Sequence, residues 1–252
     1  MTQHLFILTG ASRGMGYAMA EQLLQSGAEL LCISRNERDE LNTVAAQHNR
    51  TLSQWRADLS DASATAERLR AWLHEKAAAH YASVTLINNA ALLPKIAPLR
   101  ESSAADIALT LRVGLESVMM LTAAFLDATQ SWTCPRNVLN ISSGNGRRAM
   151  ASQSIYSAVK AGMDHYTRCV AEEEKLVTNG AKLCSLAPGI IDTDMQTHLR
   201  ESDPSKFPAH ATFVDFKLSG HLLTPEAGAA RVLAYLARED FGVNPVADVR
   251  DA

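Results

Sequence analysis

Short apolar runs alternate with longer amphipathic stretches along most of this chain. The apolar runs that predict buried strands are residues 5–8, 29–34, 52–56, 84–88, 137–142 and 181–187. The stretches that predict helices are residues 17–25, 38–48, 62–80, 104–129 and 156–178. Strands that alternate with helices form a parallel sheet covered by helices on both faces. The pattern therefore predicts an α/β fold with a doubly wound parallel sheet.

Residues 193–223 break this alternation. They contain two prolines and three aromatic side chains, Phe207, Phe213 and Phe216. A long irregular insertion in a compact domain is usually functional, so we predict a lid over a site. The three phenylalanines either line that site or belong to the core. Because no repeat or linker interrupts the chain, we expect one domain over residues 1–252.

The composition fits a globular enzyme and excludes two classes of partner. The 252 residues are 47% hydrophobic and 20% charged, which is ordinary for a soluble domain. The net charge of -3 argues against a nucleic-acid partner, because such a protein needs a basic face. No stretch approaches the roughly 20 apolar residues of a membrane span, and the first apolar run is too short for a signal peptide. We expect neither a nucleic-acid nor a membrane partner.

The four cysteines are scattered without the spacing of a metal site. They are Cys32, Cys134, Cys169 and Cys184. Unpaired thiols are typical of a reducing compartment. We therefore expect no bound metal and a cytoplasmic location.

A glycine-rich segment, T-G-A-S-R-G-M-G at residues 9–16, separates the first strand from the first helix. Glycines let the backbone turn tightly and approach a pyrophosphate, to which a helix N-terminus offers free N–H groups. The spacing differs from the G-x-G-x-x-G fingerprint, and a plain turn is the alternative. Its position after the first strand favours a dinucleotide site in a Rossmann fold. The predicted contacts are Gly10, Ser12, Arg13, Gly14, Met15 and Gly16.

The end of the second strand indicates which dinucleotide binds. NAD sites usually place an acidic residue there for the ribose 2′-hydroxyl, whereas this chain has Ser34, Arg35 and Asn36. Arg35 and Arg13 would hold a 2′-phosphate through charge-assisted hydrogen bonds. The alternative is that both arginines are merely solvated. We expect NADP(H), with Arg35 and Asn36 among its contacts.

Two further strand ends carry polar side chains suited to a cofactor crevice. Asp58, followed by Leu59, would accept a hydrogen bond from an adenine amino group or cap a helix. Asn88 and Asn89 end the fourth strand, where side-chain amides bridge neighbouring backbone and line the crevice. We expect Asp58, Leu59, Asn89 and Ala90 to bind the cofactor.

Tyr156 and Lys160 lie four residues apart, on one face of a predicted helix. A free tyrosine has a pKa of about 10, and a neighbouring ammonium group lowers it. Y-x-x-x-K alone is a weak signal, but Ser143 at the end of a predicted strand strengthens it. The Ser143 hydroxyl would stabilise negative charge on a substrate carbonyl oxygen. Ser142 and Asn140 are the alternatives.

Together these motifs resemble the short-chain dehydrogenase/reductase family. T-G-A-S-R-G-M-G, D-L, N-N-A-A, N-I-S-S, Y-S-A-V-K and A-P-G-I-I-D-T-D-M occur in order over nearly the whole chain. The resemblance implies that Tyr156 is the general acid, that Lys160 lowers its pKa and holds the nicotinamide ribose, and that Ser143 orients substrate. It also implies cofactor contacts at Pro188, Gly189, Ile191 and Thr193.

Within that family the chain is most similar to sepiapterin reductases and bacterial diketone (benzil-type) reductases. S-R-N at residues 34–36, V-L-N-I-S-S at 138–143 and P-G-I-I-D-T-D-M-Q at 188–196 carry this likeness. In sepiapterin reductases a C-terminal aspartate grips the pterin, and Asp248 falls near that position. The resemblance therefore implies a substrate contact at Asp248. A solvated aspartate in the C-terminal tail is the alternative.

Gly114 departs from the family pattern. The family usually has an asparagine there, whose backbone helps to hold a water in the proton relay. A glycine keeps the carbonyl but loses the side chain, and glycine within a helix costs on the order of 1 kcal/mol relative to alanine. We expect a bend in the helix at Gly114 and leave the relay open.

The leading hypothesis is NADPH-dependent reduction of a ketone, vicinal diketone or pterin side-chain ketone. The alternative is a catalytically weak NADP(H)-binding sensor on the same fold. The resemblance also implies a homodimer, with a tetramer as the other option, formed through the helices that begin near residues 104 and 156. Small residues would permit their close approach: Ala123, Ala124, Ala158, Ala161 and Gly162.

Overall fold

The computed structural model describes residues 3–251 and contains one seven-stranded sheet. The strands are β1 (Gln3–Thr9), β2 (Glu29–Ser34), β3 (Leu52–Arg56), β4 (Tyr81–Asn88), β5 (Arg136–Ile141), β6 (Lys182–Ala187) and β7 (Val246–Asp248). All neighbours pair in parallel, in the order β3-β2-β1-β4-β5-β6-β7. The chain reverses its direction of travel between β1 and β4, and such a switch point opens a crevice at the carboxyl ends of the strands.

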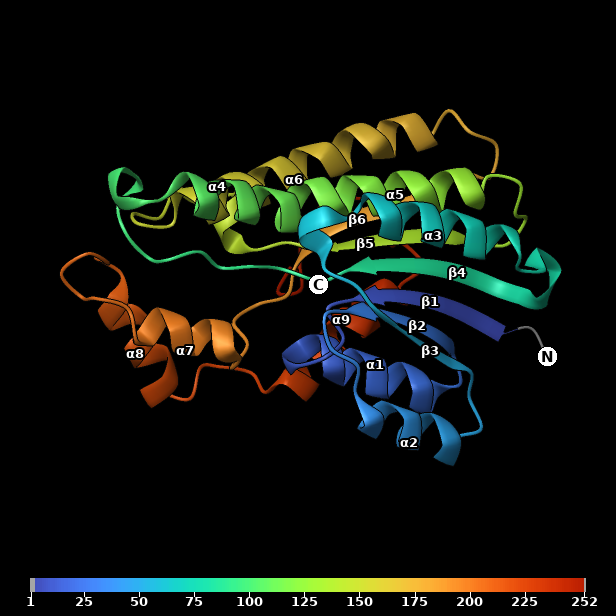
Figure 1. The fold of residues 1–252 in the computed structure, drawn as a ribbon, viewed down its shortest axis with the longest axis horizontal. Coiled ribbons are helices and arrows are strands. Elements are labelled where there is room, and N and C mark those ends of the chain that lie inside the picture. Colours follow the sequence, from blue (N-terminus) through green and yellow to red (C-terminus); the bar gives the residue numbers. More distant parts are fainter. Residues whose placement is uncertain (1–2, 252) are drawn as a thin grey trace.

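Helices cover both faces of this sheet (Figure 1). The α-helices are α1 (Gly14–Ser26), α2 (Asp39–Gln47), α3 (Ser63–His74), α4 (Ala104–Leu111), α5 (Ser117–Ala128), α6 (Ser154–Glu174), α7 (Asp194–Arg200), α8 (His210–Leu218) and α9 (Pro225–Leu236). Short 3-10 turns are η1 (Leu59–Asp61), η2 (Ala78–His80), η3 (Leu99–Glu101) and η5 (Gly144–Gly146). Helices α3 to α6 pack on one face of the sheet, and α1, α2 and α9 pack on the other. The predicted doubly wound fold is confirmed.

Strand residues divide between the two faces as the alternation of side chains in a strand requires. Leu5 and Ile7 of β1 belong to the core under α3, α5 and α6. Leu8 of β1 belongs to the core under α1 and α9. The central strands β1, β2 and β4 to β6 are largely buried on both faces, which is why they are mostly apolar in the sequence, whereas the strand β3 is only partly buried.

The elements differ from the predicted ones in several places. Helix α1 begins at Gly14, three residues earlier than expected, because the last glycines of the turn already lie in its first turn. The predicted helix 62–80 ends at His74 and is followed by a loop and the turn η2. Helix α9 and strand β7 were not predicted.

A π-helical segment, η4 (Arg112–Glu116), separates α4 from α5 and contains Gly114. A Cβ atom at Gly114 would lie 2.5 Å from Cγ1 of Val159 on α6. The expected irregularity is therefore a π turn, and an asparagine at this position would not fit beside Val159. A glycine stands at position 114 because the π turn and α6 are in close contact there.

The segment Ala104–Ala128, which spans α4, η4 and α5, is long and apolar enough to cross a membrane by length and composition. This corrects the expectation that no stretch of the chain approaches the length of a membrane span. The apolar residues of this segment are interrupted by isolated charged ones, so they do not form one continuous apolar run in the sequence. In the fold, 44% of its most apolar window is buried, as in a helix that packs on a sheet.

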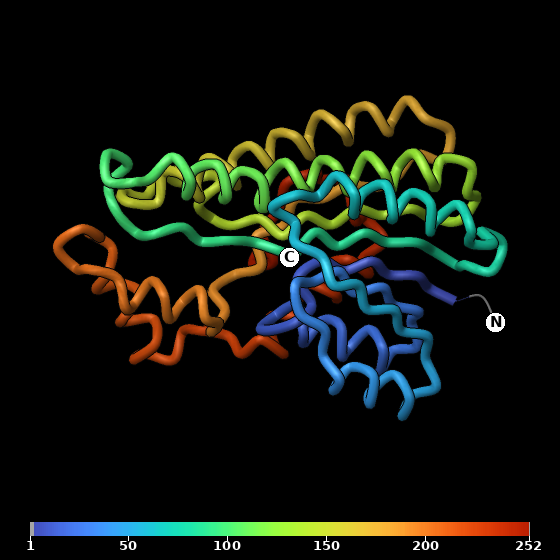
Figure 2. Tube along the Cα trace, in the orientation of Figure 1, coloured from blue at the N-terminus to red at the C-terminus, as the bar shows by residue number. Residues whose placement is uncertain are grey.

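The predicted lid, residues 193–223, is not irregular. It forms α7 and α8, which lie beside the carboxyl edge of the sheet and apart from the other helices (Figure 2). A small separate core holds them together, in which Phe207 is fully buried and stacks on Phe213, and Phe213 meets Phe216 edge to face. The prolines Pro204 and Pro208 lie between the two helices, where they do not interrupt a helix.

Candidate active site

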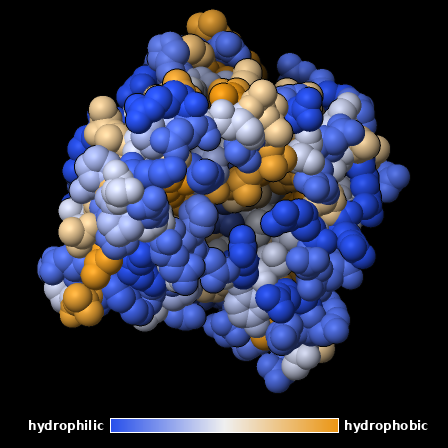
Figure 3. Space-filling model, turned by 60° about the vertical axis from the view of Figure 1, so that its left-hand side comes forward, coloured by the Kyte–Doolittle hydropathy of each residue, from blue (hydrophilic) through white to orange (hydrophobic). Residues whose placement is uncertain are grey.

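A cavity of about 430 Å³ lies at the carboxyl ends of the strands, between the glycine-rich turn, the start of α6 and the lid. On the face shown in Figure 3, hydrophobic side chains gather along one side of a central hollow. The predicted residues that line the cavity are Gly10, Ser12, Arg13, Gly14, Met15, Gly16, Arg35, Asp58, Leu59, Asn89, Ala90, Ser143, Tyr156, Lys160, Pro188, Gly189, Ile191 and Thr193. Of the described residues, Asn36 and Asp248 are predicted contacts that do not line it.

The glycine-rich turn requires glycine for two different reasons. Gly10 and Gly14 have φ angles of 71° and 54°, in the left-handed region that favours glycine. A Cβ atom at Gly16 would lie 2.1 Å from the Gly10 carbonyl oxygen, so the turn closes only without one. No side chain caps the start of α1, and its first turn carries no acidic residue. These N–H groups fit an anion such as a pyrophosphate.

Positive charge accompanies the turn. Arg13 donates to Asp194 of α7 at 2.8 Å, and both side chains are largely exposed, so an anion would replace this ion pair at little cost. Arg35 lines the same end of the cavity. Ser34, which ends β2, accepts a hydrogen bond from the Ala11 amide at 2.8 Å and so secures the turn. The chemistry of this end of the cavity fits a dinucleotide with an additional phosphate.

Polar side chains that follow β3 and β4 are held in place by hydrogen bonds to backbone groups. Asp58 lines the cavity and caps η1, because it accepts from the Ser60 amide at 2.9 Å; this hydrogen bond lowers the pKa of its carboxyl group. Asn89 donates to the carbonyls of Thr9 and Gly10 at 3.0 and 3.1 Å. Asn89 therefore bridges neighbouring backbone as expected and ties β4 to the glycine-rich turn, whereas Asn88 does not line the cavity and donates to the side chains of Thr122 and Asn140.

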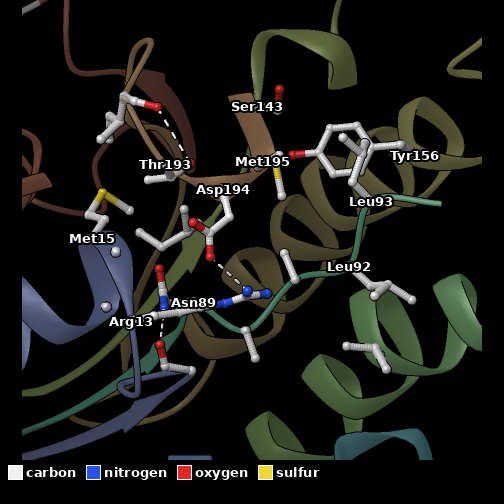
Figure 4. A pocket seen from close by; sticks show the side chains of 18 of the residues that line it. Arg13, Met15, Asn89, Leu92, Leu93, Ser143, Tyr156, Thr193, Asp194 and Met195 are labelled. Carbon is white, nitrogen blue, oxygen red and sulfur yellow. Dashed lines mark hydrogen bonds and ion pairs between the residues drawn. The ribbon is translucent and has the colours of Figure 1, made fainter. Parts of the chain in front are cut away.

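Tyr156, Lys160 and Ser143 meet at the other end of the cavity. Tyr156 and Lys160 are 7% and 2% exposed, and the Lys160 ammonium lies 5.6 Å from the centre of the Tyr156 ring. Lys160 also donates to the Ile141 carbonyl at 2.7 Å, which fixes its position. In Figure 4 Ser143 and Tyr156 appear at the upper right of the pocket, and Arg13 appears at its lower left.

Burial is the largest influence on the pKa of both titratable groups. It raises the pKa of Tyr156 to about 12, while the neighbouring Ser143 hydroxyl acts in the opposite direction. It lowers the pKa of Lys160 to about 8, and the charge of Asp164 opposes that shift. At neutral pH the protein alone holds Tyr156 protonated, the form that donates a proton. The expected lowering of the Tyr156 pKa by Lys160 stays a prediction.

A buried polar network lies behind these residues, around Asp164 on α6. Asp164 is 2% exposed and accepts hydrogen bonds from Ser142 at 2.5 Å, Ser185 at 2.7 Å and Arg147 at 3.1 Å. Ser142 is thus occupied by the network. Asn140, the other alternative to Ser143, bonds to Thr167 at 2.9 Å. Ser143 lies outside this network and lines the cavity beside Tyr156.

Asp248 does not reach the cavity. It lies on β7, is 5% exposed, and binds Arg250 with both carboxylate oxygens at 2.8 and 2.5 Å. The arginine two residues further on neutralises the carboxylate and holds it at the edge of the sheet. The prediction of a substrate contact at Asp248 is not supported by this geometry.

Several cavity residues were not predicted. They are mainly apolar or amide side chains: Leu92, Leu93, Leu109, Val113, Asn145, Gln153, Met195, Gln196 and Leu199. Met195 and Gln196 stand inside the P-G-I-I-D-T-D-M-Q motif, so their sequence position would have indicated them. Phe213 both packs in the lid core and lines the cavity.

Comparison with known proteins agrees with this geometry. The sequence model of the family described as short chain dehydrogenase matches residues 4–204. The chain belongs to the short chain dehydrogenase family. Across this family it is similar to a benzil reductase ((S)-benzoin forming) from Bacillus cereus, at 32% identity over 93% of this chain and 94% of that one.

Two further short chain dehydrogenase relatives extend the comparison. The chain is 31% identical to sepiapterin reductase from Mus musculus, over 93% of this chain and 92% of that one. A solved structure from Agrobacterium tumefaciens with bound NADP superposes with a TM-score of 0.78 at 24% identity, over 99% of this chain and 95% of that one. The chain is therefore an oxidoreductase of this family, similar to diketone and pterin reductases.

Proposed function

We propose that the protein reduces a ketone, vicinal diketone or pterin side-chain ketone to an alcohol with NADPH. The observation that supports this most strongly is that one cavity joins the glycine-rich turn and two arginines to Ser143, Tyr156 and Lys160. In such a cavity a bound cofactor and a proton donor would both lie next to the same substrate.

The choice of NADP(H) rests on charge at the nucleotide end. Arg13 and Arg35 line that end, and β2 finishes at Ser34 with no carboxylate to hold a 2′-hydroxyl or repel a phosphate. When bound, NADPH supplies the hydride. Of the residues that line the cavity, Lys160, Pro188, Gly189, Ile191 and Thr193 would hold its nicotinamide half, and Asp58 and Leu59 its adenine half.

The protein's own contribution is to hold and move a proton. Tyr156 would donate its hydroxyl proton to the carbonyl oxygen of the substrate, and Ser143 would donate a hydrogen bond to the same atom. Lys160 would stabilise the phenolate that Tyr156 becomes. The lid would help to exclude water from this end of the cavity, because Met195, Leu199 and Phe213 present apolar side chains there.

The apolar wall favours a ketone with planar or aromatic substituents. The similar benzil reductase and sepiapterin reductase are named for substrates of that kind. A homodimer in the cytoplasm is part of the same proposal: Ala158 and Ala161 are exposed on α6 and available for close helix contact, and the four cysteines form no disulfide in the described structure. Ala124, by contrast, is buried in the core of the subunit.

The direct test is NADPH oxidation by the purified protein with benzil, sepiapterin and simple ketones as substrates. We expect turnover with at least one aromatic ketone, and weaker turnover when NADH replaces NADPH. If NADPH binds and none of these carbonyls is reduced, the proposal fails in favour of the alternative, an NADP(H)-binding sensor.

A further inference from the structure

Gln153 is a buried amide in the wall of the cavity with an unused hydrogen-bond donor. It stands directly before α6, one turn ahead of Tyr156, and is 3% exposed. Its side chain lines the cavity, and within residues 3–251 its Nε2 atom has no hydrogen-bond partner. A buried donor without a partner is unfavourable and calls for an explanation such as a ligand.

Asn145 fixes which end of the Gln153 amide is used. The Asn145 side-chain Nδ2 donates to Gln153 Oε1 at 2.6 Å, so the oxygen is occupied and the nitrogen is left over. The Asn145 backbone amide donates to the Ser143 hydroxyl oxygen at 3.2 Å. Asn145 therefore connects Gln153 to the serine that faces the reacting carbonyl.

Few other groups near Tyr156 can donate a hydrogen bond to a substrate. The neighbouring wall is largely apolar, with Leu93, Met195 and Phe213 among its side chains, and the amide side chains in it besides Gln153 include Asn145 and Gln196. Ser143 and Tyr156 both serve the carbonyl oxygen that is reduced. A second oxygen on the adjacent carbon needs a donor outside that pair, and Gln153 offers the buried Nε2 group that has no partner within residues 3–251.

We infer that Gln153 is a specificity residue whose Nε2 group donates a hydrogen bond to the second oxygen of an α-dicarbonyl substrate. The inference rests on the proposed function and narrows it from ketones in general to ketones with an oxygen on the neighbouring carbon. A site built to bond such an oxygen discriminates against an analogue that lacks it, because the buried donor is then left unpaired.

The test compares benzil with deoxybenzoin, which has the same two phenyl groups but a methylene in place of the second carbonyl. For each ketone, kcat/KM of Gln153→Leu is divided by that of the wild type, which cancels the difference in intrinsic reactivity. We expect benzil reduction to fall roughly tenfold or more, since one hydrogen bond to a buried amide is lost. Deoxybenzoin reduction should fall by a clearly smaller factor.

Two further variants make the result specific. Gln153→Glu keeps the size of the side chain and replaces the donor with a carboxylate, so it should lose benzil reduction at least as strongly. Gln47→Leu, at an exposed position on α2 outside the cavity, is the matched control and should change neither ratio. NADPH affinity should be close to that of the wild type in all three variants.

Equal losses for both ketones in Gln153→Leu and Gln153→Glu would overturn the inference while leaving the proposed function intact, because Gln153 would then only support the fold of the site. Benzil reduction at the wild-type rate in either variant would overturn it as well. If the wild type reduces neither ketone with NADPH, the proposed function fails and the inference fails with it.

Discussion

At the scale of single residues, burial makes Tyr156 and Lys160 both tend toward their neutral forms. A neutral tyrosine is the useful state for proton donation, but a neutral lysine could not stabilise the resulting phenolate. Asp164 lies one turn beyond Lys160 on α6, and its charge raises the pKa of Lys160 against the effect of burial. Arg147 in turn holds the Asp164 carboxylate at 3.1 Å. The network behind the site thus keeps Lys160 charged.

Asp164→Asn should shift the alkaline limb of the activity profile to lower pH. Removing the carboxylate charge lowers the pKa of Lys160 below its value of about 8, so the ammonium form is lost earlier as pH rises. At pH 8 we expect kcat/KM to fall roughly three- to tenfold, with activity closer to wild type at pH 6. The pH dependence of kcat/KM measures this. Glu172→Gln, exposed on the same helix, is the control. A loss by the same factor at every pH would contradict this account of Asp164.

Arg35→Ala should weaken the use of NADPH and spare that of NADH. The loss of one charge-assisted hydrogen bond to a phosphate raises the KM for NADPH roughly tenfold to a hundredfold. Steady-state kinetics with both cofactors separate the two effects, and Arg231→Ala, exposed on α9, serves as the control. Equal changes for NADPH and NADH would show that Arg35 does not select the cofactor.

At the scale of helices and strands, close contact between α6 and the π turn η4 depends on Gly114. Val159 is β-branched and its side chain has little freedom to move away. The missing Cβ at position 114 leaves room for its Cγ1 atom. Gly162 of α6 makes a similar approach to Leu115, where a Cβ would lie 3.1 Å from Cδ2. These contacts fix the helix that carries Tyr156 and Lys160.

Gly114→Ala should destabilise the protein by about 1–3 kcal/mol, the usual cost of overpacking, even though alanine favours helices more than glycine does. Adding Val159→Ala should recover part of that loss, because it removes the atom that the new methyl group meets. Urea unfolding of the two single variants and the double variant measures this coupling. A more stable Gly114→Ala protein would contradict the close contact.

The sequence predicted these elements unevenly, for physical reasons. Most strands up to residue 187 were predictable because they are largely apolar and buried, whereas β7 has three residues and shows no periodicity. The motif residues of the site were predictable because turns and strand ends restrict which side chains fit. Asn145 and Gln153 were not, since their place in the cavity depends on how the chain between Ser143 and Tyr156 folds. The ion pair between Asp248 and Arg250 was likewise not predictable, because a separation of two residues in the sequence does not indicate that two side chains interact.

At the scale of the whole molecule, the exposed faces of α4 to α6 are the expected site of dimer contact. Leu109, Leu111 and Met119 are exposed apolar side chains on α4 and α5. Ala161→Arg should convert a homodimer, twice the 27.3 kDa subunit, into monomers by placing a charge in the interface. Size-exclusion chromatography with light scattering tests this against Ala46→Arg on α2. A wild type that runs as a monomer would contradict it.

The cavity joins two halves of the molecule with separate tasks. In the proposed function, the glycine-rich turn and its arginines would hold a nucleotide, while α6 and the end of β5 would supply the proton and orient the carbonyl. Turnover with a ketone requires both halves, whereas nucleotide binding requires mainly the first. A substitution at Tyr156 should therefore separate the two tasks.

The measurement that tests this account most directly is the turnover of Tyr156→Phe with NADPH and an aromatic diketone, together with its affinity for NADPH. We predict that kcat falls roughly 10²- to 10⁴-fold, the usual contribution of a general acid, with NADPH affinity within a few-fold of wild type. Tyr166→Phe, on the same helix outside the cavity, should retain activity. Activity at the wild-type level in Tyr156→Phe would contradict the central claim.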